Sequence, residues 1–219
     1  MAQQGCFITL EGVDGAGKST HVAWIAAWLK VQEISLIETR EPGGTPVGEH
    51  LRELVLHQPM DLRTETLIMF AARNEHWRMV IQPALARGQW VLCDRYTDAS
   101  FAYQGGGRQL GAPAIAQLEH WVQQGLGPDC TFLFDVPLEI AQKRLQSGRA
   151  HADRFEQEDH AFFERTRQAY HERVQAEPGR FVVIDACGSI EDVRRQLTAA
   201  LQVLVSRWQG RDGTLTGRP

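Results

Sequence analysis

A glycine-rich segment near the N-terminus contains the residues whose types and spacing most clearly indicate chemistry. It reads Gly12-Val13-Asp14-Gly15-Ala16-Gly17-Lys18-Ser19, is followed by Thr20, and matches the pattern G-x-x-x-x-G-K-[ST]. An apolar run precedes it and a helical pattern follows it, which is the context of a phosphate-binding loop (P-loop). In such a loop backbone N–H groups face an anion, Lys18 reaches the β- and γ-phosphates, and Ser19 ligates magnesium. Residues 12–20 are therefore predicted to bind the phosphates of a nucleoside triphosphate, which is ATP if a GTPase is excluded.

A second candidate site lies at the end of the apolar run Trp90–Asp94. A carboxylate at the carboxyl end of a strand beside a P-loop can organise magnesium, so Asp94 is predicted to share the metal with Ser19. Arg95 follows at once and is well placed to bind a second phosphate. The alternative for Asp94 is an ordinary surface carboxylate at a strand end, since aspartate is mostly exposed.

Short apolar runs and helical periodicities indicate the elements that must position these residues. The predicted strands are Cys6–Leu10, Ile34–Glu38, Trp90–Asp94, Cys130–Val136 and Phe181–Ile184. The predicted helices are Lys18–Lys30, Val47–Leu56, Arg63–Arg87 with a kink or division at Pro83, Pro113–Gln124, Pro137–Leu145, His160–Ala176 and Glu191–Trp208. Nearly continuous hydrophobicity in the strands is typical of parallel strands covered on both faces. The prediction is an α/β P-loop NTPase fold, a five-stranded parallel sheet with helices on both faces and a short lid.

Length and composition bound the organisation of the chain. With 219 residues, 43% of them hydrophobic, we expect one domain over residues 1–208, a lid at about residues 146–156 and a flexible tail over 209–219. The formal net charge of -4 argues against polymeric nucleic acid as a partner. The first residues lack a basic, apolar leader and no run is long enough to span a bilayer, so we expect no membrane association and a cytoplasmic location.

The P-loop alone does not decide between a GTPase switch, an ATP-driven motor and a small-molecule kinase. Guanine-specific switch proteins resemble one another in an Asn-Lys-x-Asp motif, whereas the only asparagine of this chain is Asn74, which Glu75 follows. The sequence therefore argues against a GTPase. A regulatory module that binds ATP stays open, but it gives no reason for the further polar clusters near the strand ends.

Three of these clusters carry a resemblance to a known family. They are Thr39-Arg40-Glu41-Pro42-Gly43-Gly44-Thr45, Phe70-Ala-Ala-Arg73 and Asp94-Arg95-Tyr96-x-x-x-Ser100-x-x-Tyr103-Gln104-Gly105. Together with the P-loop, and in this order along nearly the whole chain, they closely resemble the thymidylate kinase family. The resemblance implies transfer of the γ-phosphate of ATP to dTMP, with Mg²⁺ as cofactor, ATP and dTMP as small-molecule partners, and a homodimer.

The resemblance also implies roles for individual residues in dTMP binding. Phe70 would stack on the thymine ring, where the alternative is core packing, and Arg73 would donate to a base carbonyl. Arg95 would hold the acceptor phosphate, and Tyr103 would lie against the sugar C2′, where a ribose hydroxyl would clash. Asp14 would lie near the sugar 3′-hydroxyl and the transferring phosphate, and Ser100 and Gln104 would line the nucleoside pocket. Arg40 and Glu41 would belong to the adjacent acceptor-side loop. For Arg40 and Glu41, a purely structural role in ion pairs is nearly as well supported.

Members of this family place a catalytic arginine either in the P-loop or in the lid. Gly15 and Ala16 leave no arginine in the P-loop of this chain, so the role falls on the segment Ser147–Arg154. Arg149 is predicted to close over ATP, either alone or with Arg154, and for both the alternative is a solvated arginine at a helix end. The predicted catalytic residues are Lys18, Asp14, Arg95 and Arg149.

Two other interpretations stay open. A deoxynucleoside kinase shares a P-loop and an acid–arginine pair at a strand end, but it must activate a neutral sugar hydroxyl, for which Glu11 or Asp14 would have to serve as base. An ATP-binding regulator would bind ATP without transferring phosphate to any nucleotide.

Overall fold

The structure, a computed structural model, describes residues 4–148, 154–155 and 158–210. Among these residues no helix is both long enough and apolar enough to cross a membrane. The predicted lid arginine, Arg149, and residues 211–219 of the predicted tail lie outside the described residues.

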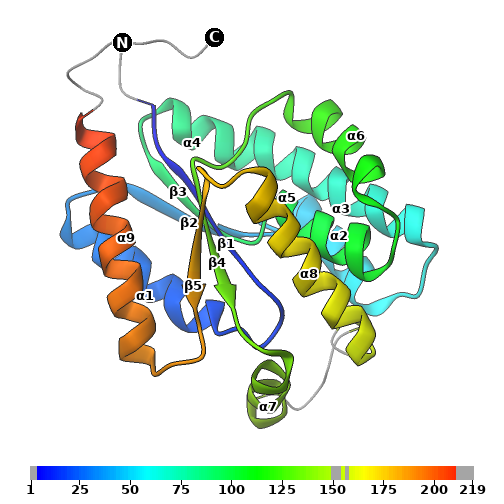
Figure 1. The fold of residues 1–219 in the computed structure, drawn as a ribbon. Coiled ribbons are helices and arrows are strands. Elements are labelled where there is room, and N and C mark those ends of the chain that lie inside the picture. The colour runs from blue at the N-terminus through cyan, green and yellow to red at the C-terminus, as the bar shows by residue number, and fades with distance from the viewer. Residues whose placement is uncertain (1–3, 149–153, 156–157, 211–219) are drawn as a thin grey trace.

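A five-stranded parallel sheet forms the centre of the structure (Figure 1). Its strands are β1 (Phe7–Glu11), β2 (Leu36–Arg40), β3 (Trp90–Asp94), β4 (Cys130–Asp135) and β5 (Phe181–Asp185), in the order β2-β3-β1-β4-β5. Every residue of the central strand β1 is buried, as its continuous apolar run predicts. The predicted α/β fold with a five-stranded parallel sheet is therefore confirmed.

The pairing register brings the ends of three strands together. Asp94 at the end of β3 pairs with Leu10 of β1 and with Arg40 of β2. The segments that follow these strands therefore emerge at one edge of the sheet, where open α/β sheets bind ligands. β2 begins two residues later than predicted, because Ile34 donates its backbone N–H to the carbonyl of Leu29 and closes the turn after the preceding helix.

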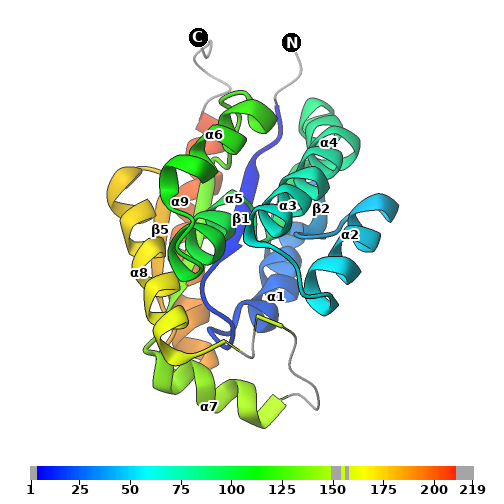
Figure 2. The same ribbon diagram turned by 90° about the vertical axis from the view of Figure 1, so that its right-hand side faces the viewer.

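Helices cover both faces of the sheet, as predicted. Figure 1 shows α1 and α9 over one face and α4, α5 and α8 over the other, while α7 lies beyond the carboxyl ends of the strands in both Figures 1 and 2. Outside the segment described next, the α-helices are α1 (Lys18–Val31), α2 (Pro46–His57), α5 (Thr97–Ser100), α6 (Ala112–Gln123), α7 (Leu138–Gly148), α8 (His160–Ala176) and α9 (Ile190–Gly210). α9 continues two residues beyond the predicted end at Trp208.

The segment predicted as one long helix over Arg63–Arg87 consists of three elements. They are α3 (Leu62–His76), the π-helix η1 (Trp77–Ile81) and α4 (Gln82–Ala86). Pro83 has no N–H to donate to the preceding turn, and π-helical turns are among the usual causes of a helix break. The division expected at Pro83 is present, but it takes the form of a π-helix that precedes the proline.

A second π-helix, η2 (Phe101–Gly107), carries two of the predicted acceptor-site residues. It packs closely against α8, since a Cβ at Gly106 would lie 2.6 Å from the Cβ of Ala169 and 2.9 Å from the carbonyl oxygen of Arg165. Only a glycine allows the two helices to approach this far. The contact therefore fixes the backbone on which Tyr103 and Gln104 stand.

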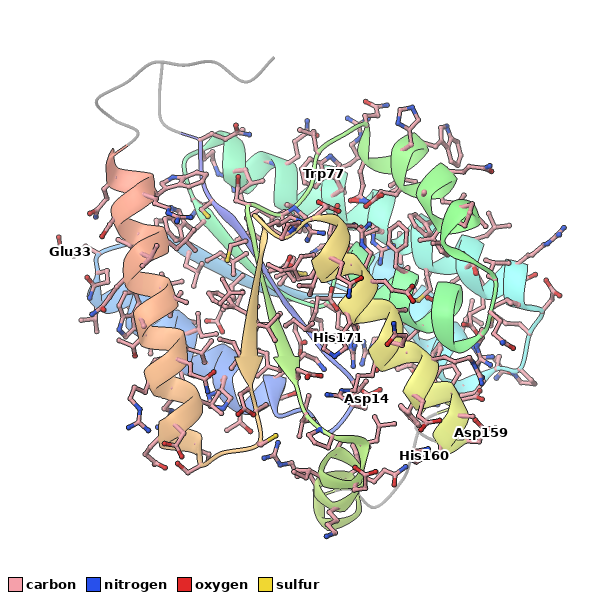
Figure 3. All side chains as sticks on the ribbon, viewed as in Figure 1. Asp14, Glu33, Trp77, Asp159, His160 and His171 are labelled. Atoms are coloured by element: carbon pink, nitrogen blue, oxygen red, sulfur yellow. The ribbon has the colours of Figure 1, made fainter. Side chains whose placement is uncertain are left out.

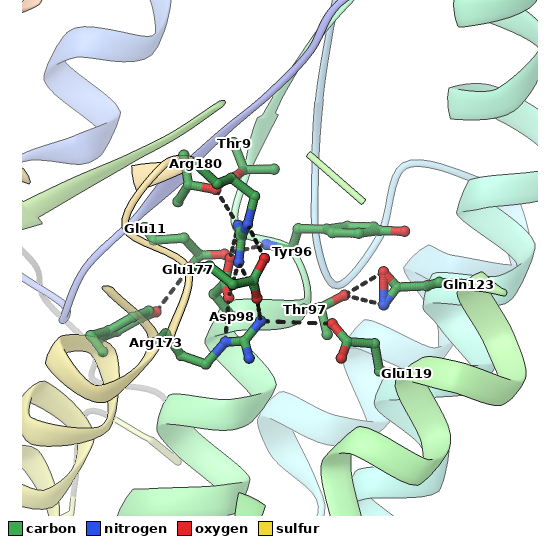
Figure 4. A network of polar contacts seen from close by, with 12 residues as sticks. Thr9, Glu11, Tyr96, Thr97, Asp98, Glu119, Gln123, Arg173, Glu177 and Arg180 are labelled. Carbon is green, nitrogen blue, oxygen red and sulfur yellow. Dashed lines mark hydrogen bonds and ion pairs between the residues drawn. The ribbon is translucent and has the colours of Figure 1, made fainter. Parts of the chain in front are cut away.

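A buried ion-pair network anchors α5, the short helix just after β3 (Figure 4). Asp98 accepts hydrogen bonds from Arg173 Nε (2.8 Å) and Arg180 Nη1 (2.7 Å). Burial alone would raise the pKa of Asp98, but its hydrogen bonds to the two arginines and their charges lower it. Arg180 also donates to Thr131 of β4. The network therefore ties α5 to α8 and to the sheet.

We expect Asp98→Asn to lower the free energy of unfolding by about 2 kcal/mol, because two partly buried guanidinium groups lose the buried one of the two carboxylates that they share and keep only Glu177. Urea denaturation measures the change. The control is Glu53→Gln, which removes an exposed carboxylate 3.4 Å from His57 Nε2 and should cost less than about 0.5 kcal/mol. Equal losses in the two variants would contradict a stabilising role for the network.

Candidate active site

A cavity of about 440 Å³ lies at the carboxyl ends of the strands. The predicted ATP-site residues that line it are Asp14, Gly15, Gly17, Lys18, Ser19 and Thr20. The predicted acceptor-side and metal residues that line it are Arg40, Glu41, Asp94, Arg95, Tyr103 and Gln104. Figure 3 shows Asp14 at the end of the sheet near which α8 begins at His160. The structure thus brings the two halves of the predicted site into one cavity.

The P-loop connects β1 to α1 in a conformation that requires glycine. Gly12 has a φ of 138°, and a Cβ there would lie 2.4 Å from the carbonyl oxygen of Phe134. Lys18 Nζ donates to the carbonyl oxygens of Gly12 (2.8 Å) and Val13 (3.2 Å). Burial, together with the charge of Arg95, lowers the pKa of Lys18 to about 8. An anion beside Lys18 would favour its charged form, as a phosphate-binding role requires.

Asp14, Arg95 and Tyr103 form a closed cluster in the cavity. Arg95 Nη2 donates to Asp14 Oδ1 (2.5 Å) and to the Tyr103 hydroxyl (3.0 Å), and that hydroxyl donates to Asp14 Oδ2 (2.7 Å). Burial alone would raise the pKa of Asp14, but the charges of Arg95 and Lys18 outweigh it and lower the pKa to about 2. The carboxylate of Asp14 is therefore ionised near neutral pH and is a weak proton acceptor.

The backbone of Arg95 is strained. Its φ of 68° lies in the left-handed region, which a residue with a Cβ rarely adopts. Contacts at both ends of the residue hold this conformation: its N–H donates to Leu10 O (2.9 Å), and its Nη1 donates to Gly12 O (3.0 Å) and to the Tyr170 hydroxyl (3.1 Å). Strain of this kind clusters at functional sites, and here it accompanies a guanidinium group bound to the P-loop.

Glu11, the last residue of β1, is a buried carboxylate next to the cavity. Its two oxygens accept hydrogen bonds from the Tyr96 N–H (2.7 Å) and the Tyr170 hydroxyl (2.8 Å). Burial, with a contribution from the negative charge of Asp98, raises the pKa of Glu11 to about 7. Glu11 is not among the described residues that line the cavity.

Ser19 and Asp94 offer oxygen donors that fit a magnesium ion. Both residues line the cavity, and Asp94 Oδ1 is buried with no hydrogen-bond partner among the described residues. Within the same part of the chain, no group of three or more His, Cys, Asp or Glu side chains could hold a metal. Magnesium commonly binds one or two protein oxygens and completes its coordination with phosphates and water, so this donor set suits it.

Two ion pairs hold the loop that follows β2. Glu41 is buried, accepts a hydrogen bond from Arg73 Nε (2.7 Å), and has its other oxygen 2.9 Å from His76 Nδ1. Arg40 forms an exposed pair with Glu49 at 2.8 Å. Because Arg40 and Glu41 also line the cavity, their ion pairs determine the shape of its wall.

Phe70, Arg73 and Ser100 are buried and are not among the described residues that line the cavity. Arg73 is only 1% exposed and donates to Ser100 Oγ (3.0 Å) and Tyr96 O (3.0 Å). Its guanidinium carbon lies 4.7 Å from the centre of the Phe70 ring, so this ring already has a planar partner. Met69 reaches the cavity from the same helix. The expected contacts of Phe70, Arg73 and Ser100 with a nucleotide therefore stay predictions.

Comparisons with known proteins agree with these features. The profile described as Thymidylate kinase matches residues 10–197. The chain belongs to the thymidylate kinase family. It is 61% identical over 207 residues to the thymidylate kinase of Bordetella pertussis, which covers 94% of this chain and 99% of that protein. It is 57% identical over 201 residues to the thymidylate kinase of Cupriavidus metallidurans, which covers 92% of this chain and 100% of that protein.

The cavity of this thymidylate kinase family member contains two arginines that the sequence did not reveal. Arg144 of α7 lines the cavity and donates to the carbonyl of Ala186 (2.8 Å). Arg52 of α2 also lines it and donates to the carbonyl of Pro42 (2.9 Å). No local pattern separates either residue from a surface arginine on an amphipathic helix. For Arg144, the one available signal is its position just before the predicted lid.

The raised pKa of Glu11 predicts a pH dependence of stability. The folded state keeps Glu11 protonated up to a pH of about 7, whereas an ordinary glutamate releases its proton near 4.5, so this residue makes stability fall as the pH rises between these values. Glu11→Gln removes the effect. From about pH 5 to about pH 8, wild type should lose on the order of 2–3 kcal/mol more unfolding free energy than the variant, measured by urea denaturation.

The control for this comparison is Glu33→Gln, which changes an exposed residue far from Asp14 (Figure 3). Its pH profile should follow that of the wild type. Parallel profiles for Glu11→Gln and wild type would show that Glu11 is ionised normally in the folded state.

Proposed function

We propose that the chain is a cytoplasmic kinase that transfers the γ-phosphate of ATP to dTMP, giving dTDP and ADP. The observation that carries this proposal is that one cavity joins the P-loop to the Asp14, Arg95 and Tyr103 cluster in a chain that belongs to the thymidylate kinase family. A P-loop alone leaves the class of reaction open. The second cluster supplies a place for a phosphorylated acceptor.

The acceptor oxygen in this reaction belongs to a phosphate monoester. The second pKa of such a group is about 6, so the oxygen is mostly ionised at neutral pH and needs no strong general base. This oxygen forms a bond to the γ-phosphorus while the bond from that phosphorus to the β,γ-bridging oxygen breaks, and ADP leaves with the electron pair. Catalysis then rests on alignment and charge neutralisation.

The donor side of the site is formed by residues 12–20. The backbone N–H groups of the loop and the ammonium of Lys18 bind the β- and γ-phosphates and oppose the charge that develops on the leaving ADP. Ser19 and Asp94 would hold Mg²⁺, which when bound with ATP supplies further neutralisation of the phosphate charge. Arg149, from the predicted lid, would add a cation on the transferring group.

The acceptor side of the site is formed around Arg95. Its guanidinium group, fixed by Asp14, holds the acceptor phosphate, and Tyr103 places its ring against the sugar C2′, where it disfavours ribose. Gln104 faces the nucleoside. Behind these residues, Phe70, Arg73 and Ser100 complete the base pocket, while Arg40 and Glu41 shape the adjacent loop.

The same geometry disfavours a deoxynucleoside kinase. A neutral sugar hydroxyl would need a base in contact with it, with a pKa near the working pH. Glu11 has a suitable pKa, but both of its oxygens are engaged, and it is not among the described residues that line the cavity. Asp14 lines the cavity, but its pKa of about 2 makes it a weak base.

Release of ADP with ATP and magnesium, measured separately with dTMP, dUMP, UMP, dCMP and thymidine, tests the proposed function. We expect the highest kcat/KM with dTMP, weaker activity with dUMP, no activity with UMP or thymidine, and none when magnesium is omitted. Activity with thymidine alone would establish a nucleoside kinase instead. Binding of ATP without transfer to any acceptor would establish a regulator.

We further propose that the protein works as a homodimer. Large apolar side chains are exposed at Leu67 of α3 (54%), Met79 of η1 (64%) and Trp121 of α6 (74%), and α3 packs against α6. Covering such side chains with a second copy would remove apolar surface from water. Light scattering should therefore give twice the mass of one chain, and Leu67→Glu should lower this mass. A monomeric wild type would contradict the proposal.

A further inference from the structure

One buried carboxylate, which has no part in the chemistry described above, binds three side chains from two distant parts of the chain. Glu65 of α3 is 1% exposed. It accepts hydrogen bonds from Arg154 Nη2 (2.5 Å), Arg108 Nε (3.0 Å) and Gln104 Nε2 (2.8 Å). Arg108 makes a further ion pair with Glu158 (2.8 Å). Burying a charge this deeply costs free energy unless its hydrogen-bonding partners are all in place.

The first partner, Arg154, holds a short segment against α2 and the cavity. Its N–H donates to Leu56 O (3.4 Å) and its Nε donates to Val55 O (3.1 Å), so its guanidinium group is engaged by α2 and Glu65. The next residue, Phe155, is buried, lines the cavity, and meets the Tyr103 ring edge to face with a centroid distance of 5.9 Å. Through Arg154, Glu65 therefore holds Phe155 beside Tyr103, the residue predicted to exclude ribose.

The second partner, Gln104, has its amide orientation set by Glu65. An ionised carboxylate can only accept hydrogen bonds, so the NH₂ group of Gln104 must face Glu65. Gln104 lines the cavity, and its Oε1 is buried without a hydrogen-bond partner among the described residues. A buried acceptor without a donor is unfavourable, and a ligand N–H would satisfy it.

We propose that Glu65 is a positioning residue for the acceptor nucleotide. By binding the NH₂ group of Gln104 it presents Oε1 as an acceptor to the base, and by binding Arg154 it holds Phe155 against Tyr103. A pyrimidine with a ring N–H, as in thymine or uracil, matches this acceptor, whereas cytosine presents an unprotonated ring nitrogen that repels it. Arg154 thus acts through Glu65 on the acceptor side. This inference rests on the proposed function, because it assigns a specificity device to the same site.

Steady-state kinetics of Glu65→Gln, with dTMP, dCMP and ATP varied in turn, test the proposal. A carboxamide at residue 65 can face Gln104 with either of its ends, so the amide of Gln104 becomes free to rotate. We expect the KM for dTMP to rise about tenfold and the preference for dTMP over dCMP, as a ratio of kcat/KM values, to fall about tenfold, with the KM for ATP within about twofold of wild type. Glu65→Asp, which keeps the charge, should restore part of the preference.

Two further variants separate positioning from stability. Asp98, like Glu65, is a buried carboxylate that binds two arginines, but it is not among the described residues that line the cavity. Asp98→Asn should therefore reduce stability without changing the ratio of the kcat/KM values for dTMP and dCMP. Gln104→Met removes the acceptor while leaving Glu65 in place, and it should lower the ratio as Glu65→Gln does. This second route does not depend on whether Glu65→Gln folds.

An unchanged dTMP:dCMP ratio in Gln104→Met, or in folded Glu65→Gln, would overturn the inference. Equal loss of the ratio in Asp98→Asn would also overturn it, because it would show a general effect of instability. Failure of the proposed function would look different, since wild type would then transfer no phosphate to dTMP in the same assay.

Discussion

The ion pair between Asp14 and Arg95 is the interaction on which the site depends. Its partners are 81 residues apart in the chain, and the pairing of β1 with β3 brings them together. Tyr103 completes the cluster from η2, whose backbone is held by the close contact at Gly106 with α8. Arg95 repels Lys18 and lowers the pKa of Lys18, and the negative charge of Asp14 offsets part of this repulsion. The carboxylate therefore lets two cations share one cavity.

Two carboxylates three positions apart show how strongly the surroundings decide protonation. Glu11 is buried between a backbone N–H and a tyrosine hydroxyl, and burial raises its pKa to about 7. Asp14 is also buried, but two nearby cations lower its pKa to about 2. Glu11, whose pKa would suit a general base, is not among the described residues that line the cavity. Asp14 lines the cavity, but its low pKa keeps it ionised. A site of this kind suits an acceptor that is already ionised.

The parts of the fold and of the site that could be predicted from the sequence are those indicated by short local patterns of residues. The P-loop follows one apolar strand, and Asp94 with Arg95 stands at the end of another, so their places at the carboxyl edge of a parallel sheet could be predicted from the sequence. Glu65 could not be found in this way, because its partners are 39 to 89 residues away and its helix looks ordinary in sequence. The π-helices were also missed, since the apolar periodicity of a short π-helical turn does not differ visibly from that of an α-helix. Only the resemblance assigned Phe70 and Arg73 to the base, and because both are buried and outside the described cavity lining, their contacts with a nucleotide stay predictions.

The position of β2 has a consequence beyond the cavity. In the described sheet it pairs on one side only, with β3, and a free strand edge is a template onto which another chain can add. Glu38 and Arg40 place opposite charges on this strand, and both side chains are exposed. Because charges at an edge hinder intermolecular β-pairing, the arginine that borders the cavity also disfavours the addition of another chain to this edge of the sheet.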